Sequence, residues 1–165
     1  MKPYEQIVTS LHGIAYTIHH NDEPSYSFLE EGELSIEIPS PDDKDKITLD
    51  TEGIEYTLYF GNSHAHYYID EPEELDALIE CVKDIVDNKV LSAAIFFYEE
   101  DRQLHWLGSR FLDVDKSNGM PITELFRHVY EIKEFRDKIE HKGGEVHFRF
   151  WDASLNKVII LPVEK

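Results

Sequence analysis

The chain has 165 residues, of which 34 are acidic and 16 are lysine or arginine, giving a formal net charge of −18. This charge argues against nucleic acid or an anionic membrane as the partner, because both need cationic surfaces. The length and the 41% hydrophobic content are typical of one globular domain, which we expect to span residues 1–165. No apolar run approaches the roughly 20 residues of a membrane span, and the single cysteine, Cys81, fits a reducing compartment. We therefore expect a cytoplasmic protein with no membrane partner.

The negative charge lies mainly in the first half of the chain. Residues 22–55 hold 12 acidic and 2 basic residues, and residues 70–88 hold 8 acidic and 1 basic. Residues 125–165, by contrast, hold 7 acidic and 8 basic residues. The asymmetry favours a basic protein partner, although solubility alone is a sufficient reason for an acidic surface.

The N-terminal segment carries apolar residues at helical spacing, which predicts an amphipathic helix over residues 3–18. Short runs of alternating apolar and polar residues follow, and each predicts a strand. These runs contain Tyr26 and Phe28, then Leu34, Ile36 and Ile38, and then Ile47 and Leu49. Because tight turns separate them, we expect an antiparallel meander.

Residues 56–70 are the most unusual run in the chain and predict two strands around a turn at Gly61. His64 and His66 lie two positions apart on the second strand, so their side chains share a face of the sheet. Tyrosines flank the pair on both strands. We predict a binding surface made of Tyr59, Asn62, His64, His66, Tyr67 and Tyr68.

The second half of the chain alternates helical and strand patterns. Asp70, with Glu73 and Pro72 after it, is a candidate N-cap for a helix that ends near Asn88. Its apolar stripe consists of Leu75, Leu78, Ile79, Val82, Ile85 and Val86, with Cys81 off the stripe. Residues 91–98 predict a central strand, residues 103–107 a partner strand, residues 123–141 a second long helix, and residues 146–160 a last hairpin. The class is α+β, with one largely antiparallel sheet and two or three helices packed on it.

The two histidines also suggest an alternative function as a metal-dependent hydrolase. Side chains at i and i+2 on a strand are close enough to share a zinc ion, and His64 and His66 are the candidate ligands. Zinc needs at least a third ligand, which His105, His147 or a carboxylate could supply. The other interpretation of the pair is a polar, aromatic surface for a protein partner, without any cofactor.

The run from Asp113 to Glu124 partly matches a calcium-binding loop. Asp113, Asp115, Ser117 and Glu124 occupy positions 1, 3, 5 and 12, but Asn118 stands where the loop needs glycine. A polar loop that leads into a helix is the commoner meaning of this pattern. Nucleophile-elbow, P-loop and dinucleotide-binding motifs are absent from the sequence, so it offers no positive signal for an enzyme.

The hairpin and the acidic helix after it resemble a family of small cytoplasmic bacterial proteins. These proteins carry an aromatic-Gly-x-x-His-x-His-aromatic signature, matched here by Phe60, Gly61, His64, His66 and Tyr67. Most of them are uncharacterised, and some are similar to immunity proteins of toxin systems. The resemblance covers about residues 54–88 and implies neutralisation of a partner protein. We therefore expect a non-catalytic, acidic binding protein for a basic protein partner.

Overall fold

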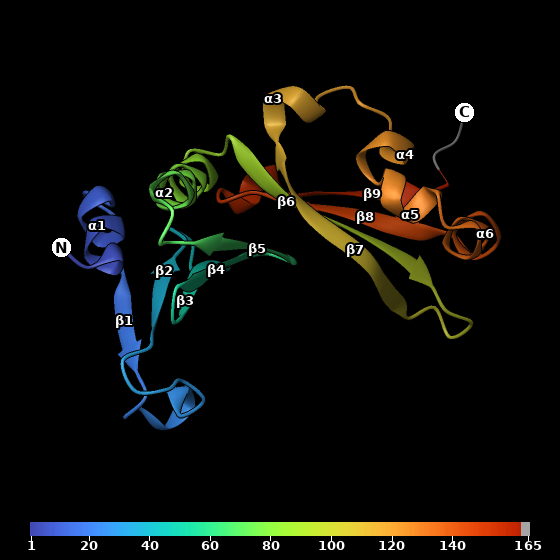
Figure 1. Cartoon of the computed structure of the whole chain (residues 1–165). Coiled ribbons are helices and arrows are strands. Elements are labelled where there is room, and N and C mark those ends of the chain that lie inside the picture. The colour runs from blue at the N-terminus through green and yellow to red at the C-terminus, as the bar shows by residue number, and fades with distance from the viewer. Residues whose placement is uncertain (163–165) are drawn as a thin grey trace.

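Nine strands form two antiparallel sheets in the computed structural model, which describes residues 1–162 (Figure 1). The first sheet follows chain order and consists of β1 (Thr17–His20), β2 (Leu34–Pro39), β3 (Lys46–Glu52), β4 (Glu55–Phe60) and β5 (Ser63–Tyr68). The second sheet has the order β7 (Leu104–Asp113), β6 (Val90–Tyr98), β8 (Gly144–Arg149) and β9 (Lys157–Leu161). The predicted α+β class and antiparallel pairing are confirmed, but the strands divide between two sheets instead of forming one.

The first sheet is the expected meander, and its large apolar side chains alternate along the strands. On β4, Tyr56, Leu58 and Phe60 are buried, whereas Tyr59 between them is exposed. The β4–β5 hairpin pairs Phe60 with Ser63, so its loop is only Gly61 and Asn62. This hairpin is where the sequence predicted it.

Two helices cover one face of the first sheet. They are α1 (Pro3–Ser10) and α2 (Pro72–Val86), which are also next to each other (Figure 1). Their buried residues join those of β2, β3 and β4 in one core, and α2 contributes Leu75, Leu78, Val82 and Ile85. The predicted apolar stripe of this helix is confirmed.

Three local predictions in the first half are wrong. The N-terminal helix stops at Ser10 because Gly13 adopts a φ of +77° and Ile18 pairs with Ile36 in the sheet. Tyr26 ends a short 3-10 helix, η1 (Pro24–Tyr26), and does not lie in a strand. The N-cap of α2 is Glu71, not Asp70, and its side chain makes no capping hydrogen bond. In each case the local sequence pattern predicts more regular structure than the chain forms.

Cys81 lies closer to the core than its place off the stripe suggested. It is partly buried against the first core, and burial is the main cause that raises the pKa of its thiol. Tyr67 is its hydrogen-bond partner from β5. A raised pKa keeps the thiol protonated, and the protonated thiol is a poor nucleophile.

The second sheet carries its own helices on one face. They are the short α3 (Val114–Ser117), α4 (Ile122–Leu125) and α5 (Arg127–Tyr130), followed by α6 (Lys133–Lys142) (Figure 1). Buried residues of α4 to α6 pack with alternate residues of β6 and β8 in a second core. β6 is the central strand that its apolar pattern predicted.

The single long helix predicted over residues 123–141 is instead broken into three pieces. Breaks at Phe126 and Ile132 let the short helices turn, so that Phe126, Val129 and Ile139 all reach the sheet. Ile132 was predicted to face inward, but 46% of it is exposed. Arginine side chains donate to the carbonyls of Leu125 and Tyr130, which the breaks leave without helical partners.

The two sheets meet at the β4–β5 turn. The Ser63 hydroxyl lies 2.6 Å from the Ser92 hydroxyl of β6, and Ser109 of β7 donates to the carbonyl of Asn62 at 2.5 Å. Gly61 has a φ of +59°, and a Cβ there would lie 2.8 Å from the Ser92 hydroxyl oxygen, so only glycine fits without displacement. Trp151, just after β8, packs with Phe60 in the first core. The first core thus continues onto the second sheet.

Candidate functional site

The face of the first sheet opposite α1 and α2 is polar and rich in charge. Alternation along the strands places on it the side chains that the core excludes. We call this surface the acidic face; its members are His19, Glu37, Lys46, Asp50, Glu52, Glu55, Tyr59, His64, His66 and Tyr68. Its four carboxylates outnumber the single lysine, so the surface is negative.

His64 and His66 lie on this face, as the sequence predicted. Their rings meet edge to face with centroids 5.2 Å apart, and the Tyr59 ring lies 5.8 Å from that of His64. His66 Nδ1 forms an ion pair with Glu55 and lies 3.2 Å from the Thr57 hydroxyl. Both imidazoles are exposed, so they are available to a partner.

Two of the predicted binding residues do not belong to this surface. Tyr67 points to the opposite face of β5, where it packs on the first core and contacts Cys81. Asn62 lies in the turn, and its backbone holds the two sheets together. Alternation already placed Tyr67 opposite the histidines, whereas the role of Asn62 depends on a contact with a distant part of the chain. Tyr59, His64, His66 and Tyr68 remain together.

Tyr26 packs against one edge of the acidic face, where it contacts His19 and Glu37. The Tyr26 ring stacks on the His19 ring at 4.0 Å, and its hydroxyl donates to Glu37 at 2.7 Å. The hydrogen bond from Lys46 is the largest cause that lowers the pKa of Glu37. Burial and the bond to Glu37 raise the pKa of Tyr26 to about 12. The loop before β2 is therefore fastened to the face.

The raised pKa of Tyr26 makes a prediction for alkaline stability. A group with a raised folded pKa adds stability that is complete below its unfolded pKa, about 10, and is lost towards its folded pKa, about 12. We expect Tyr26→Phe to be less stable than the wild type at pH about 9, with the gap closing as the pH approaches about 12. Urea denaturation across this range measures the gap, with Tyr68→Phe as control. A gap that is independent of pH would contradict the Tyr26–Glu37 bond.

The second sheet leaves an apolar surface on the face that lacks helices. Trp106 is 58% exposed, Ile160 59% and Val158 51%. We call this surface the apolar patch; it consists of Phe96, Leu104, Trp106, Val158 and Ile160, whose register places them on one face. At its centre, Tyr98 donates to Glu145, and His147 Nε2 lies 2.6 Å from the same carboxyl group. The hydrogen bond from Tyr98 is the largest cause that lowers the pKa of Glu145, and the hydrogen bond with His147 lowers it further.

No pattern in the sequence predicts the apolar patch as a site. Leu104 and Trp106 alternate with His105, and Val158 and Ile160 alternate with Lys157 and Ile159. Alternation alone cannot say which face is covered, because the helices that cover the other face come from residues far away in the sequence. Five apolar residues gathered on an uncovered sheet face are a feature typical of interaction surfaces.

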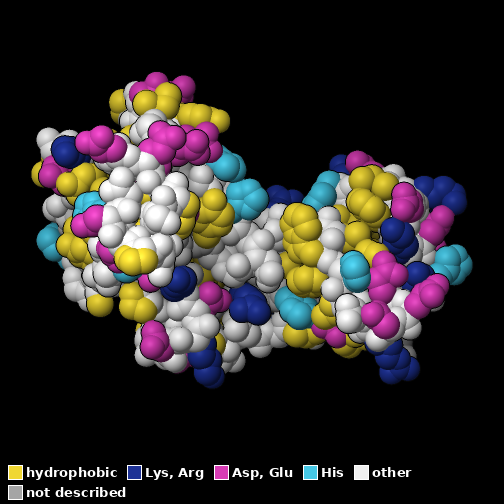
Figure 2. Space-filling view, turned by 90° about the horizontal axis from the view of Figure 1, so that it is seen from below, with side chains coloured by type: hydrophobic (Ala, Val, Ile, Leu, Met, Phe, Trp, Pro, Cys, Tyr) yellow, Lys and Arg dark blue, Asp and Glu magenta, His cyan; other side chains and the backbone are white. Residues whose placement is uncertain are grey.

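At the β4–β5 turn, the end of the acidic face that carries Tyr59 and His64 lies next to the second sheet. Seen from the side away from most helices, the surface is hollowed between the parts formed by the two sheets (Figure 2). Histidine and hydrophobic side chains lie on both sides of the hollow, and a group of acidic side chains lies at the rim of one side. The bonds of Ser109 and Ser92 to the turn fix this junction.

Residues 1–162 do not bring together a set of ligands for either zinc or calcium. Among residues 1–162, no group of three histidine, cysteine or carboxylate side chains is arranged to hold a metal ion. The calcium-loop residues instead serve α3: Asp113 accepts from the backbone of Lys116, and Ser117 donates to the Val114 carbonyl. No helix within this part of the chain is long and apolar enough to span a bilayer.

Comparison of the chain with protein-family models, curated proteins and solved structures finds no match.

Proposed function

We propose that the chain is a non-catalytic, cytoplasmic binding protein that holds a basic protein partner in the hollow between its two sheets. The observation that carries the proposal is the junction of two uncovered sheet faces, one acidic and one apolar. Protein interfaces commonly combine apolar anchors with a polar, charged rim. Trp106 is the natural anchor, because tryptophan is enriched among residues that dominate binding energy.

The charge of the acidic face supports a basic partner. Glu52 and Glu55 are directly opposite each other in the register, an arrangement of like charges that costs stability in an isolated sheet. A cationic partner offsets this repulsion and is drawn in by the negative field. Lysine or arginine side chains of the partner would pair with Glu52, Glu55 and Asp50, and aromatic or histidine contacts would come from Tyr59, His64 and Tyr68.

An immunity-like role agrees with this surface. A protein that neutralises a basic toxin needs a complementary acidic surface and no catalytic centre of its own. The resemblance of residues 54–88 to small bacterial proteins, some of them similar to immunity proteins, points in the same direction. In this interpretation the histidine pair contacts the partner and binds no metal.

Affinity capture from a lysate of the source cells, at low and high salt, tests the proposal. We expect one basic protein to be retained at about 50 mM salt and lost at about 500 mM, because screening weakens exposed charge pairs. A second acidic protein of similar size serves as the control for general ion exchange. Retention of the same proteins by both baits, or of none at low salt, would refute a specific basic partner.

A further inference from the structure

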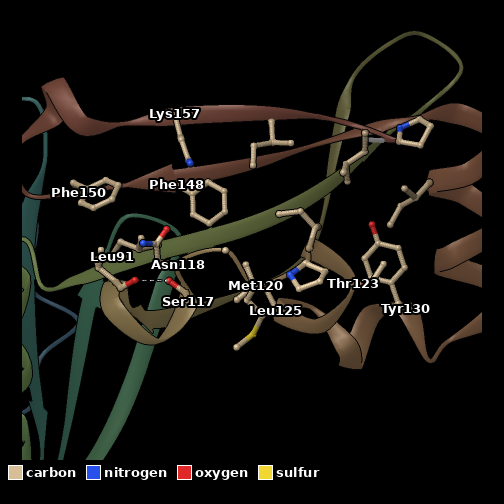
Figure 3. Close-up of a pocket in the computed structure, with 18 of the residues that line it drawn as sticks. Leu91, Ser117, Asn118, Met120, Thr123, Leu125, Tyr130, Phe148, Phe150 and Lys157 are labelled. Atoms are coloured by element: carbon tan, nitrogen blue, oxygen red, sulfur yellow. Dashed lines mark hydrogen bonds between the residues drawn. The ribbon is translucent and has the colours of Figure 1, made fainter. Parts of the chain in front are cut away.

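A second site lies on the other side of the second sheet, away from the hollow. A cavity of about 720 Å³ opens between β8 and β9 on one side and the segment from α3 to α5 on the other. Its size is in the range of pockets for small molecules. Most of its wall is apolar, with Leu91, Met120, Leu125 and Phe148 among the lining residues (Figure 3).

The polar groups of this cavity lie at two ends. Lys157 and Asn118 are at one end, and the Lys157 amine lies 5.4 Å from the centroid of the Phe148 ring (Figure 3). Tyr130 is at the other end, with its hydroxyl directed inward (Figure 3). Among residues 1–162, no carboxylate lies within ion-pair distance of the Lys157 amine.

The two ends of the cavity differ in charge. Burial raises the pKa of Tyr130, and the nearby Glu140 carboxylate adds to this effect. Glu140 also lines the cavity, so the Tyr130 end is negative and the Lys157 end is positive. An anionic group is therefore favoured beside Lys157 and disfavoured beside Tyr130.

We infer that the cavity binds a small amphipathic molecule with an apolar body and one anionic head group. The head group pairs with Lys157 and accepts a hydrogen bond from the Asn118 amide. The apolar body lies against Phe148, Leu125 and Met120, and its far end reaches the Tyr130 hydroxyl. This site is separate from the hollow and does not depend on the proposed protein partner.

Titration with decanoate, followed by calorimetry and by NMR of the methyl groups, tests this inference on the full chain. We expect decanoate to bind with shifts confined to the cavity methyls, including those of Ile122 and Ile159, and to bind more tightly than decanol. Lys157→Met should weaken decanoate about tenfold and leave decanol unchanged, because a charge-assisted contact of this kind is worth roughly one decade. Lys157→Arg should restore binding, and Lys133→Met, on an exposed lysine of α6, is the matched control.

Three results would overturn the inference. The first is no decanoate binding, and the second is equal affinity for decanoate and decanol. The third is shifts at residues outside the cavity. Ile122→Trp, which fills the cavity, should abolish binding of both compounds while circular dichroism stays native. If this variant does not fold, the methyl shifts of the wild type and of Lys157→Met decide.

Discussion

Phe60→Ala is expected to lower the free energy of unfolding by about 4 kcal/mol, the largest effect of any single change considered. The Phe60 side chain is 1% exposed, lies in the first core, and has its ring centroid 5.9 Å from that of Trp151. Its removal leaves a cavity where the first core reaches the second sheet, so both the buried area and the junction suffer. The Ser63 and Ser92 side chains nearby are hydrogen-bonded to each other and cannot move in to fill such a space.

Urea denaturation of Phe60→Ala and Tyr59→Ala gives the comparison. Tyr59 is the adjacent residue, is 41% exposed and points to the acidic face, so its replacement should cost less than about 1 kcal/mol. Because both variants remove an aromatic ring from the same strand, strand propensity is matched. A loss below about 1 kcal/mol for Phe60→Ala would mean that the two sheets are not joined through this core.

Elements with strong local patterns were predictable from the sequence. The β4–β5 hairpin, the meander and α2 all have clear alternation or helical periodicity over their whole length. The pairing of His64 and His66 on one face followed directly from the period of two. The same period places Tyr67 on the opposite face, apart from the other residues of β5 in the predicted binding surface.

The features that were missed depend on contacts between distant segments. The helix pattern over residues 123–141 is broken because three short pieces fit the second sheet better than one rod. The junction of the two sheets depends on the close approach of the Gly61 turn to Ser92, 31 positions further along the chain. The apolar patch and the cavity exist only because helices cover one face of the second sheet and not the other. No local pattern contains this information.

The central claim is that the partner binds in the hollow, and a paired set of charge variants tests it most directly. The hollow variant combines Glu52→Lys and Glu55→Lys on the acidic face with Trp106→Ala on the apolar patch. The back-face variant combines Asp76→Lys and Glu80→Lys on the exposed side of α2, beyond the first core. Both variants reverse two carboxylates, so they have the same net charge and differ in where the charges lie and in the loss of the anchor.

The measurement is the affinity of each variant for the captured partner. Each variant is immobilised on a surface and titrated with the partner at one fixed salt concentration. We expect the hollow variant to lose about 100-fold or more in affinity, since an anchoring tryptophan is worth about 2 kcal/mol or more and charge reversal slows association. The back-face variant should stay within about threefold of the wild type, because its charges lie far from the contact surface. Equal losses in the two variants would show that net charge alone attracts the partner, and would contradict binding in the hollow.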